Sequence, residues 1–479
     1  MSYSKFAEAL IPFCEKLRST VENGNEIAVV THLDADGITS GSIIAYALAR
    51  MDAKYCIRAV SEMSTNLIEK LKAENHDFYI ITDLGSGWAA NLRKVLGGKW
   101  VVIDHHQISE EEILTDDSGQ ILNAWKYGID GGREVPAGGM AYMVANTLDK
   151  KNRDLSSIAV VSAVADRQDQ GDKKSFMGLN SEILKTAQSL GLVSVDLDIM
   201  LTGRETRPLH EALAYTSFPF IETLTWNPEN CHALLKNAGI KLKDNSGRWR
   251  TPAEFTQEEK SAILDAIARF VTKSAKTSTG VINDLVGYVY TLAAEDRRSQ
   301  LRDAREFSTM LNACGRIGRA GVGISICMGD RGNMLNDGED IIHTYRTTLR
   351  TYVSTIFADK WRLVDDGKNA FVNGDGLLAE DMLGAISSLL SGSPSLSGRL
   401  IFVRTLTNDG TYRFSSRKCL GCDSRANLGL IMRHCAEAFH GAGGGHSAAA
   451  GCRIPSSAIE DFTASVRAAI SDPKFATES

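Results

Sequence analysis

Residues 26–37 read EIAVVTHLDADG, a short apolar run that ends in one histidine and two aspartates. The run is rich in β-branched side chains, which predicts a buried strand, and a helical stretch follows it. His32, Asp34 and Asp36 occupy alternate positions, so on an extended segment their side chains point to the same side. The stretch therefore predicts a strand of an α/β sheet that delivers three polar side chains to one edge.

Three further apolar runs in the first part of the chain end in the same kind of cluster. These runs, with the residues after them, are Asp77–Thr82 with Asp83, Lys99–Ile103 with Asp104, His105 and His106, and Ile158–Val164 with Asp166. Helical stretches separate the runs, as in a parallel α/β sheet, although the last run lacks alternation and fits a buried helix equally well. Ligands of open α/β sheets bind outside the carboxyl ends of the strands, so we expect the four clusters to converge in one crevice.

This combination of side chains indicates a site for divalent metal ions. Imidazole and carboxylate ligands suit manganese or a comparable ion, whereas a structural zinc site favours thiolates. Asp83, His105 and Asp166 add enough ligands for two ions, and two ions about 4 Å apart can activate a water and stabilise the leaving oxygen in phosphoryl hydrolysis. Any single cluster can be explained as a helix cap. Capping does not account for six such residues at the predicted strand ends.

Four motifs, taken in order, resemble those of the DHH phosphoesterase family. They are His32-x-Asp34-x-Asp36-Gly37, Asp83 within TDLG, Asp104-His105-His106, and Asp166 within VADR. The resemblance implies one ion held by His32, Asp34 and Asp83, and a second held by Asp36, Asp83, His105 and Asp166. It also implies that His106 faces the scissile phosphate and that Asp104 orients the histidine pair from behind. The implied cofactor is two Mn²⁺ ions per site, with Mg²⁺ or Co²⁺ as alternatives.

A glycine-rich stretch, residues 441–451 (GAGGGHSAAAG), marks a second candidate site. Backbone without side chains lets a phosphate approach closely, although a flexible linker has a similar composition. The stretch resembles the Gly-Gly-His signature of the DHH-associated domain DHHA1, which implies that Gly444, Gly445 and His446 bind a nucleic acid or nucleotide rather than pyrophosphate. The family's Ser-x-Arg element resembles residues 414–417 (FSSR), which assigns Arg417 and either Ser415 or Ser416, with Ser416 preferred, to the substrate.

Two further stretches resemble archaeal RecJ-like single-strand nucleases: residues 122–133 (LNAWKYGIDGGR) with the following residues 137–142 (AGGMAY), and residues 311–319 (LNACGRIGR). Arginine binds phosphate through planar, bidentate donors, so we assign Arg316 and Arg319 to a nucleic-acid backbone. The other arginines nearby are interleaved with acidic residues and fit a solvated helix face. The resemblance implies single-stranded DNA or RNA as the substrate. Some relatives associate with the GINS complex, which makes GINS a candidate partner.

The sequence predicts three parts in an α/β protein. Residues 1–200 form a parallel-sheet DHH domain, residues 201–335 a mainly helical middle region, and residues 336–479 a smaller α/β DHHA1-like domain. In this last part we expect helices at 377–390 and 428–439 and strands at 399–405 and 412–416. The resemblance places the active-site cleft between the DHH and DHHA1-like domains.

Composition limits the cellular setting and the mode of binding. The net charge of the 479 residues is −6, so any nucleic-acid site is a local groove rather than a generally basic surface. A signal peptide and an apolar run of about 18 residues are both lacking, so we expect a cytoplasmic protein without a membrane partner. Nine scattered cysteines indicate reduced thiols. Cys419 and Cys422 have zinc-ligand spacing, but a second pair is missing and plain cysteines are the preferred interpretation.

Three functions fit these observations. The first is a manganese-dependent exonuclease acting on single-stranded DNA or RNA in replication or repair. The second is a replication scaffold that binds GINS, and the third is a phosphodiesterase of short oligonucleotides. A scaffold has no need of so costly a concentration of like charge, and every ligand is present, which favours catalysis. The arginine-rich middle region favours a longer polymer. Replacing the bridging carboxylate, Asp83→Ala, is expected to abolish hydrolysis.

Overall fold

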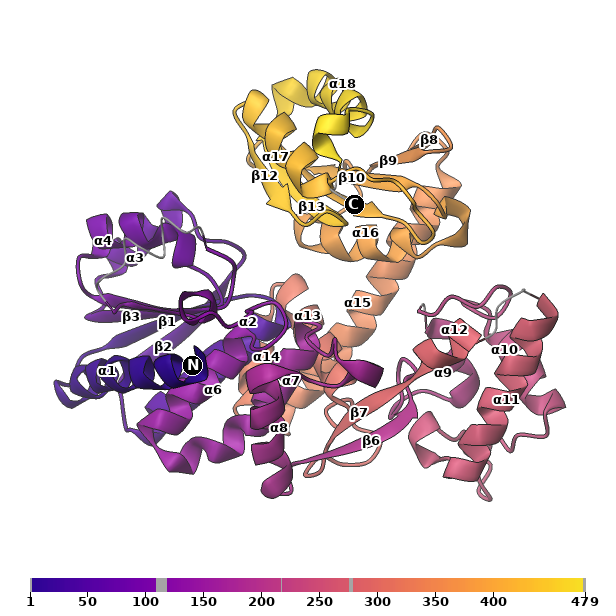
Figure 1. Cartoon of the computed structure of the whole chain (residues 1–479), viewed down its shortest axis with the longest axis horizontal. Helices are drawn as coiled ribbons and strands as arrows, with labels where there is room; N and C mark the ends of the chain where they lie inside the picture. Colours follow the sequence, from indigo (N-terminus) through magenta and orange to yellow (C-terminus); the bar gives the residue numbers. More distant parts are fainter. Residues whose placement is uncertain (1, 109–118, 217, 275–278, 477–479) are drawn as a thin grey trace. The chain divides into compact units, whose positions relative to one another are not determined.

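The computed structural model describes residues 2–108, 119–216, 218–274 and 279–476, and it divides the chain into two units, Met1–Ile342 and His343–Ser479. The first unit is built on a five-stranded sheet with the order β2-β1-β3-β4-β5, in which all neighbours are parallel (Figure 1). Its strands are β1 (Ile27–His32), β2 (Tyr55–Val60), β3 (Phe78–Thr82), β4 (Trp100–Asp104) and β5 (Ile121–Asn123). Thr31 pairs with Thr82, and Thr82 with Ile103, so β1, β3 and β4 end at the same edge.

Helices cover both faces of this sheet, which explains why its central strands are continuous apolar runs. On one face, Val30, Ile81 and Val102 pack with α3 (Thr65–Glu74) and α4 (Ala89–Leu96). The helices of the other face are α1 (Ser2–Glu22), α2 (Ala35–Arg50) and α6 (Ala137–Leu148). The sequence prediction of a parallel α/β sheet is confirmed.

The run at residues 158–164 is a helix rather than a strand. It lies in α7 (Ser156–Ala165), which packs against α2 and α6, and Asp166 follows as its C-cap. The helical alternative was therefore correct, and strand β5 ends the sheet instead. Strands β2 and β5 escaped the sequence analysis because β2 is a half-exposed edge strand and β5 has only three residues.

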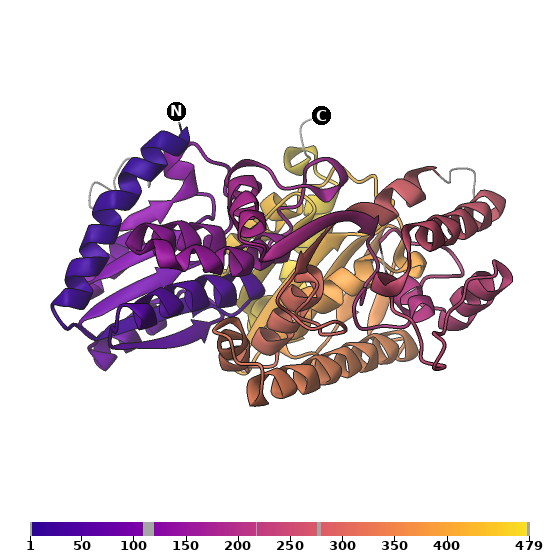
Figure 2. The ribbon, with the colours of Figure 1, turned by 90° about the horizontal axis from the view of Figure 1, so that it is seen from below.

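A two-stranded antiparallel ribbon, β6 (Val193–Ile199) and β7 (Val286–Leu292), follows α8 (Gly178–Ser189) and leads to a helical subdomain (Figures 1 and 2). The subdomain comprises α9 (Leu209–Tyr215), α10 (Pro228–Asn237), α11 (Gln257–Ser274) and α12 (Thr279–Leu285). These helices share one apolar core that includes Leu213, Leu235 and Ile267. The predicted helical middle region is confirmed.

After β7 the chain returns to the first sheet domain. Helix α13 (Ala304–Arg316) packs against α7 and α2, and α14 (Ala320–Cys327) packs against α2. The buried face of α13 includes Phe307, Leu311 and Cys314. Helix α15 (Asn333–Ala358) follows and carries the boundary between the two units.

The second unit contains a six-stranded mixed sheet with the order β12-β13-β11-β10-β9-β8. Its strands are β8 (Leu363–Asp365), β9 (Asn369–Asn373), β10 (Leu400–Leu406), β11 (Thr411–Lys418), β12 (Ala442–Gly445) and β13 (Ala449–Pro455). Helix α16 (Leu383–Ser391) contributes to the core on one face, and α17 (Leu428–Ala438) and α18 (Ile459–Ile470) to the core on the other. The predicted small α/β domain is confirmed, but the helix expected at 377–390 begins only at Leu383, and strands β8, β9, β12 and β13 and helix α18 were not predicted.

Short 3-10 helices complete the described secondary structure. They are η1 (Ser86–Trp88), η2 (Ala124–Tyr127), η3 (Lys150–Leu155), η4 (Asp172–Lys174), η5 (Pro252–Glu254), η6 (Glu380–Met382), η7 (Pro394–Leu396), η8 (Ser456–Ala458) and η9 (Pro473–Phe475). Over the residues that the structure describes, no helix combines the length and apolar character needed to cross a membrane.

Candidate metal centre

The loop after β1 is shaped by its first carboxylate. Asp34 is the N-cap of α2 and accepts a hydrogen bond from the Gly37 N–H at 2.9 Å, which is the usual role of aspartate at this position. A side chain at Gly37 would meet the His32 carbonyl oxygen at 2.2 Å, so this turn requires glycine. The opposite oxygen of Asp34 lies 3.0 Å from His32 Nδ1. Asp34 thus both caps α2 and belongs to the cluster of histidine and aspartate side chains.

Asp36 is held from two helices. Its Oδ2 accepts the Ala137 N–H and its Oδ1 accepts the Gly138 N–H, both at 2.9 Å, at the amino end of α6. The Ser162 hydroxyl, from α7, donates to the same Oδ1. These three hydrogen bonds fix the orientation of the Asp36 carboxylate.

Asp83, directly after β3, is in a strained conformation. Its φ is 64°, in the left-handed region that aspartate tolerates better than most residues, and its backbone N–H donates to the Ile103 carbonyl at 2.9 Å. The side chain is 2% exposed, and among the described residues its Oδ2 has no hydrogen-bond partner. A buried carboxylate oxygen without a hydrogen bond is costly, and a bound cation would satisfy it better than the His32 Nδ1, which lies 3.6 Å away.

The two histidines after β4 are fixed by Asp104. Its Oδ1 accepts the backbone N–H groups of His105 and His106 and, at 2.8 Å, the His106 Nδ1, while Oδ2 accepts the Ser86 N–H. Asp104 is buried, whereas the His106 side chain is 61% exposed. His106 therefore lies at the edge of the cluster, with much of its imidazole open to solvent.

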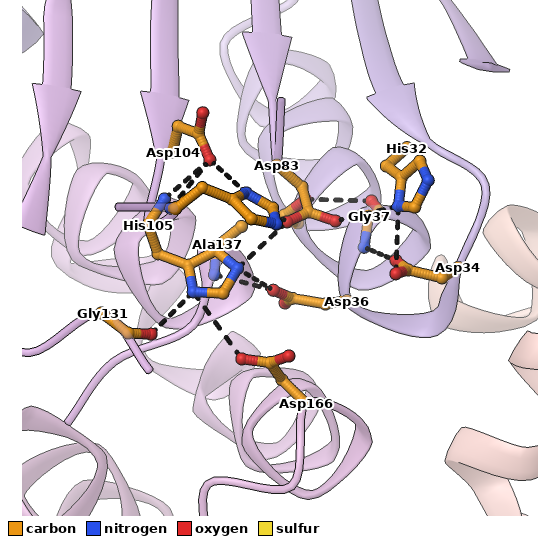
Figure 3. Close-up of polar contacts among 12 residues, drawn as sticks. His32, Asp34, Asp36, Gly37, Asp83, Asp104, His105, Gly131, Ala137 and Asp166 are labelled. Carbon is orange, nitrogen blue, oxygen red and sulfur yellow. Dashed lines mark hydrogen bonds and ion pairs between the residues drawn. The ribbon is translucent and has the colours of Figure 1, made fainter. Parts of the chain in front are cut away.

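His105 has a defined tautomer. Its Nδ1 lies 2.7 Å from the Gly131 carbonyl oxygen and donates to it, which leaves Nε2 as the nitrogen that could bind a metal ion. Nε2 lies 3.3 Å from Asp83 Oδ1 and 3.4 Å from Asp36 Oδ2 (Figure 3). Gln168 donates to both Gly131 and Asp166 at 2.7 Å, so one buried amide aligns the histidine's anchor and the last carboxylate.

Three groups of side chains have ligand atoms close enough to share an ion. They are His32, Asp34 and Asp83; Asp36, His105 and Asp166; and Asp83, His105 and His106. Asp83 lies between the other ligands, with Oδ2 toward His32 and Oδ1 toward His105 (Figure 3). The four clusters that the sequence placed at separate points thus come together in one place. The donor set, carboxylates with imidazoles, and the orphaned Asp83 oxygen fit two divalent ions.

The pKa shifts within the cluster reflect its excess of carboxylates. Burial and the neighbouring Asp83 carboxylate raise the pKa of Asp36, and burial raises that of Asp166. Burial opposes protonation of His105, but Asp83 and Asp36 outweigh it and raise its pKa. The chain by itself therefore retains protons at positions where divalent ions would replace them.

A cavity of about 380 Å³ adjoins the cluster in the first unit. His32, Asp83 and His106 form one wall, and its other lining residues are Ser61, Glu62, Met63, Leu84, Gly85, Ser86, Gly87, Trp88, Asp104, Gln107 and Ile108. Polar ligands beside apolar and aromatic walls are typical of small-molecule sites.

The predicted phosphate-binding arginines lie at one end of α13. Arg316 is in the last turn of this helix, and its neighbour Gly315 is packed against the loop after β1, where an added Cβ would meet the Leu33 carbonyl oxygen at 1.7 Å. Arg319 is exposed and forms an ion pair of 2.8 Å with Asp337. Arg316 is thus one residue from a direct contact with the metal-binding loop.

The remaining predicted substrate residues lie in the second unit. Ser416 is fully buried and donates to the Ala450 carbonyl at 3.1 Å. Ser415 and Arg417 both contact Ser387, at 2.8 and 3.2 Å. Since alternate residues of a strand share a face, Ser415 rather than Ser416 lies on the side of Arg417.

Gly444 and Gly445 are in strand β12, and His446 begins the turn to β13, where its N–H donates to Ala449 at 2.8 Å. Gly445 has a φ of 136°, which favours glycine. His446 is exposed. In the described part of the chain, the groups of three or more metal-ligating side chains include neither Cys419 nor Cys422.

Several functional positions escaped the sequence analysis. Gly131, Ser162 and Gln168 orient the candidate ligands through the contacts above. Gln168 lies two positions from Asp166, but the other contacts described above for these residues span 26 to 126 positions. The only sequence signal was the resemblance of residues 122–133, which contains Gly131 without giving it a role.

Comparison with protein families agrees with this geometry. Residues 26–165 match the DHH family N-terminal domain, residues 201–286 the DHH-CID domain, and residues 375–472 the DHHA1 domain. The chain therefore contains regions that match a DHH, a DHH-CID and a DHHA1 domain, in this order along the sequence.

Relatives of known sequence or structure extend over most of the chain. An uncharacterized protein of Methanocaldococcus jannaschii is 28% identical over 442 residues, which cover 91% of each chain. CDC45 from Entamoeba histolytica has a similar fold, with a TM-score of 0.62, 12% identity, and coverage of 97% of this chain and 99% of that one. An exonuclease RecJ bound to manganese gives a TM-score of 0.56 at 16% identity, covering 98% and 95%.

RecJ from Thermus thermophilus in complex with Mn²⁺ gives a TM-score of 0.57 at 16% identity over 97% of this chain. The match covers 54% of the Thermus protein, so the chain spans about half the length of that relative. The fold is therefore RecJ-like.

Proposed function

We propose that this protein is a manganese-dependent phosphodiesterase that degrades single-stranded DNA or RNA from an end during replication or repair. The observation that carries the proposal is the position of Asp83, whose two oxygens face different groups of candidate ligands and whose buried Oδ2 has no hydrogen bond within the described part of the chain. Two RecJ structures of similar fold contain manganese, which supports the choice of metal.

In this proposal His32, Asp34 and Asp83 hold one ion, and Asp36, Asp83, His105 and Asp166 hold the other. When bound, the ions supply Lewis acidity at the phosphate and lower the pKa of the attacking water. The chain contributes the geometry: the N-terminus of α6 fixes Asp36, and the Gly131 carbonyl fixes the ring of His105.

His106 is the residue proposed to meet the phosphate. The hydrogen bond from Nδ1 to Asp104 raises the pKa of His106, so its imidazole holds a proton near neutral pH more readily than a free histidine. A charged imidazole with an exposed Nε2 can donate to a non-bridging phosphate oxygen or to the leaving oxygen. Asp104 acts through His106 and is a positioning residue.

The rest of the substrate is assigned by proximity and chemistry. Arg316 and Arg319 are proposed to bind the backbone on the side of α13, and the 380 Å³ cavity beside His106 to receive a nucleotide. Residues of the second unit are proposed to make additional contacts with the nucleic-acid strand. They are Arg417, Gly444, Gly445 and His446. Ser415 replaces Ser416 in this group because Ser416 faces the core.

The test is degradation of end-labelled single-stranded DNA and RNA with Mn²⁺, with a chelator control. Asp83→Asn is a better variant than Asp83→Ala because asparagine tolerates the left-handed backbone that alanine would strain. Asp52→Asn is the matched control, since Asp52 is an exposed aspartate with a φ of 56° outside the cluster. We expect stepwise shortening by wild type and Asp52→Asn, and a loss of at least a thousandfold in Asp83→Asn.

Activity of Asp83→Asn at the wild-type level would contradict the site. Cleavage of di- to tetranucleotides with no cleavage of longer strands would replace the polymer with a short-oligonucleotide substrate.

A replication scaffold is the second candidate function. The observation that favours a scaffold is the similarity in fold to CDC45, which extends over 97% of this chain. Co-purification of the intact chain with GINS, together with no hydrolysis of any strand in Mn²⁺, Mg²⁺ or Co²⁺, would support the scaffold in place of the nuclease.

A further inference from the structure

The metal-binding loop alternates between ligands and residues with no chemistry of their own. His32, Asp34 and Asp36 point into the cluster, while Leu33 and Ala35 lie between them. Something must hold these intervening residues if the three ligands are to keep their separation. The contacts of Leu33 and Ala35 come from a helix nearly 280 positions further along the chain.

Helix α13 makes both contacts. Asn312 Oδ1 accepts the N–H of Ala35 at 3.1 Å. Ala35 is the first residue of α2, so its N–H is one of the donors that a helix leaves without an intrahelical partner. Asp34 satisfies the Gly37 N–H from within the loop, and Asn312 satisfies the Ala35 N–H from outside it.

The second contact is a close approach of backbones. A Cβ on Gly315 would lie 1.7 Å from the Leu33 carbonyl oxygen and 2.8 Å from its carbonyl carbon. Only glycine lets α13 come this near, and Gly315 is one turn from Asn312 on the same helix. The helix is itself well anchored, because Phe307, Leu311 and Cys314 are fully buried.

Helix α13 also packs against α7, whose C-cap is Asp166. One helix therefore supports both sides of the cluster: the loop that carries three ligands, and the helix that presents the last carboxylate.

We infer that Asn312 and Gly315 are positioning residues for the metal centre, which hold the loop at residues 32–36 in its ligand-binding shape through Ala35 and Leu33. The importance of these residues for catalysis rests on the proposed function. Their contacts with the loop do not depend on it. Loss of the Asn312 acceptor frees the first turn of α2 and lets Asp34 and Asp36 move relative to Asp83. The result is weaker metal binding without unfolding.

The experiment compares two substitutions of Asn312 with opposite predictions. Asn312→Leu removes the acceptor at similar volume, whereas Asn312→Asp keeps an oxygen in the same place. Calorimetric titration with Mn²⁺ is expected to show affinity lowered about tenfold in Asn312→Leu, and within about threefold of wild type in Asn312→Asp. Retained affinity in Asn312→Leu, or equal losses in both variants, would overturn the role.

A second pair of variants tests the backbone contact. Gly315→Ala is expected to lower Mn²⁺ affinity by at least the same factor, because its methyl group displaces Leu33. Gly321→Ala is the matched control, since a Cβ on Gly321 in α14 meets nothing within 4 Å, and it is expected to bind as wild type does. Equal affinity of Gly315→Ala and Gly321→Ala would overturn the contact.

Hydrogen exchange separates this inference from the proposed function. Peptides that cover residues 33–37 are expected to exchange faster in Asn312→Leu than in wild type or Asn312→Asp, with no metal added. If wild type binds no Mn²⁺, the proposed function fails, and faster exchange still supports the role of α13 in holding the loop. Unchanged exchange in Asn312→Leu would refute that role, whatever the metal result.

Discussion

Two regions of the first unit bury charged side chains, and they do so in opposite ways. At the root of the helical subdomain, Asp198 receives both Arg204 at 2.8 Å and Lys260 at 2.7 Å, and Arg204 also pairs with Glu205 at 2.7 Å. Two positive and two negative groups thus satisfy one another. In the candidate metal centre, five carboxylates meet three imidazoles, and the Asp83 Oδ2 receives no hydrogen bond from any residue that the structure describes.

The difference separates structural charge from functional charge. A buried ion network that closes on itself needs nothing further, and its removal damages only the fold. A buried cluster with excess negative charge is unfavourable by itself, which supports the proposal that bound cations complete it. Arg204 and Lys260 are for this reason weak candidates for binding nucleic acid, although both are basic.

The largest effect on stability is expected at the closed network. Asp198→Ala leaves Arg204 and Lys260 buried without their shared partner, and we expect it to lower the free energy of unfolding by about 3–5 kcal/mol. Mn²⁺ affinity of the folded fraction should not change. Denaturant unfolding and calorimetry measure the two quantities. A variant of wild-type stability would mean that the network is not closed in the way described.

A smaller effect, dependent on pH, is expected at Glu306 on α13. Burial, with the nearby Asp303 carboxylate, raises the pKa of Glu306 to about 7. The folded chain then keeps a proton that the unfolded chain loses near pH 4.5, so this group lowers stability as the pH rises from about 4.5 to about 7. The fall is at most about 3 kcal/mol.

Glu306→Gln has no such titration. Denaturant unfolding at several pH values should therefore show wild type losing stability relative to Glu306→Gln up to about pH 7, and a constant difference above it. Parallel curves for the two proteins across this range would show that Glu306 titrates normally.

The smallest effect on stability is expected in the candidate metal centre, where removing a charge should stabilise the metal-free chain rather than destabilise it. Burial raises the pKa of Asp166, which means that its ionised form is unfavourable in the chain without metal. Asp166→Asn keeps an oxygen that can accept from Gln168 and removes the charge. We expect the metal-free variant to be more stable than wild type by about 1 kcal/mol at pH 7, while its Mn²⁺ affinity falls. Lower stability of the metal-free variant would identify Asp166 as a structural residue.

The sequence predicted which residues come together in the candidate metal centre better than it predicted the elements that carry and support them. His32, Asp34, Asp36, Asp83 and His105 follow strands whose apolar runs are visible in the sequence, and parallel strands bring their ends together. Asp166 was found through its motif although its element is a helix, because an apolar run without alternation fits both structures. The half-exposed strand β2 and the three-residue β5 have too little pattern to be recognised.

The supporting contacts depend on long-range packing and could not be derived from local patterns. Asn312 meets Ala35, and Gly131 meets His105, only after the sheet and its helices have assembled. The choice between Ser415 and Ser416 required the register of β11, which decides the face of each residue. A glycine such as Gly315 has no distinguishing feature in the sequence beyond its place in a family-like stretch.

The central claim is that the candidate metal centre holds two divalent ions, with Asp83 as a ligand of both. Isothermal titration of the metal-free chain with Mn²⁺, read for stoichiometry in wild type and in Asp83→Asn, tests it most directly. We predict two ions per chain in wild type, and at most one weakly bound ion in Asp83→Asn, with Asp52→Asn unchanged. Fewer than two ions in wild type, or two ions of equal affinity in Asp83→Asn, would contradict the account.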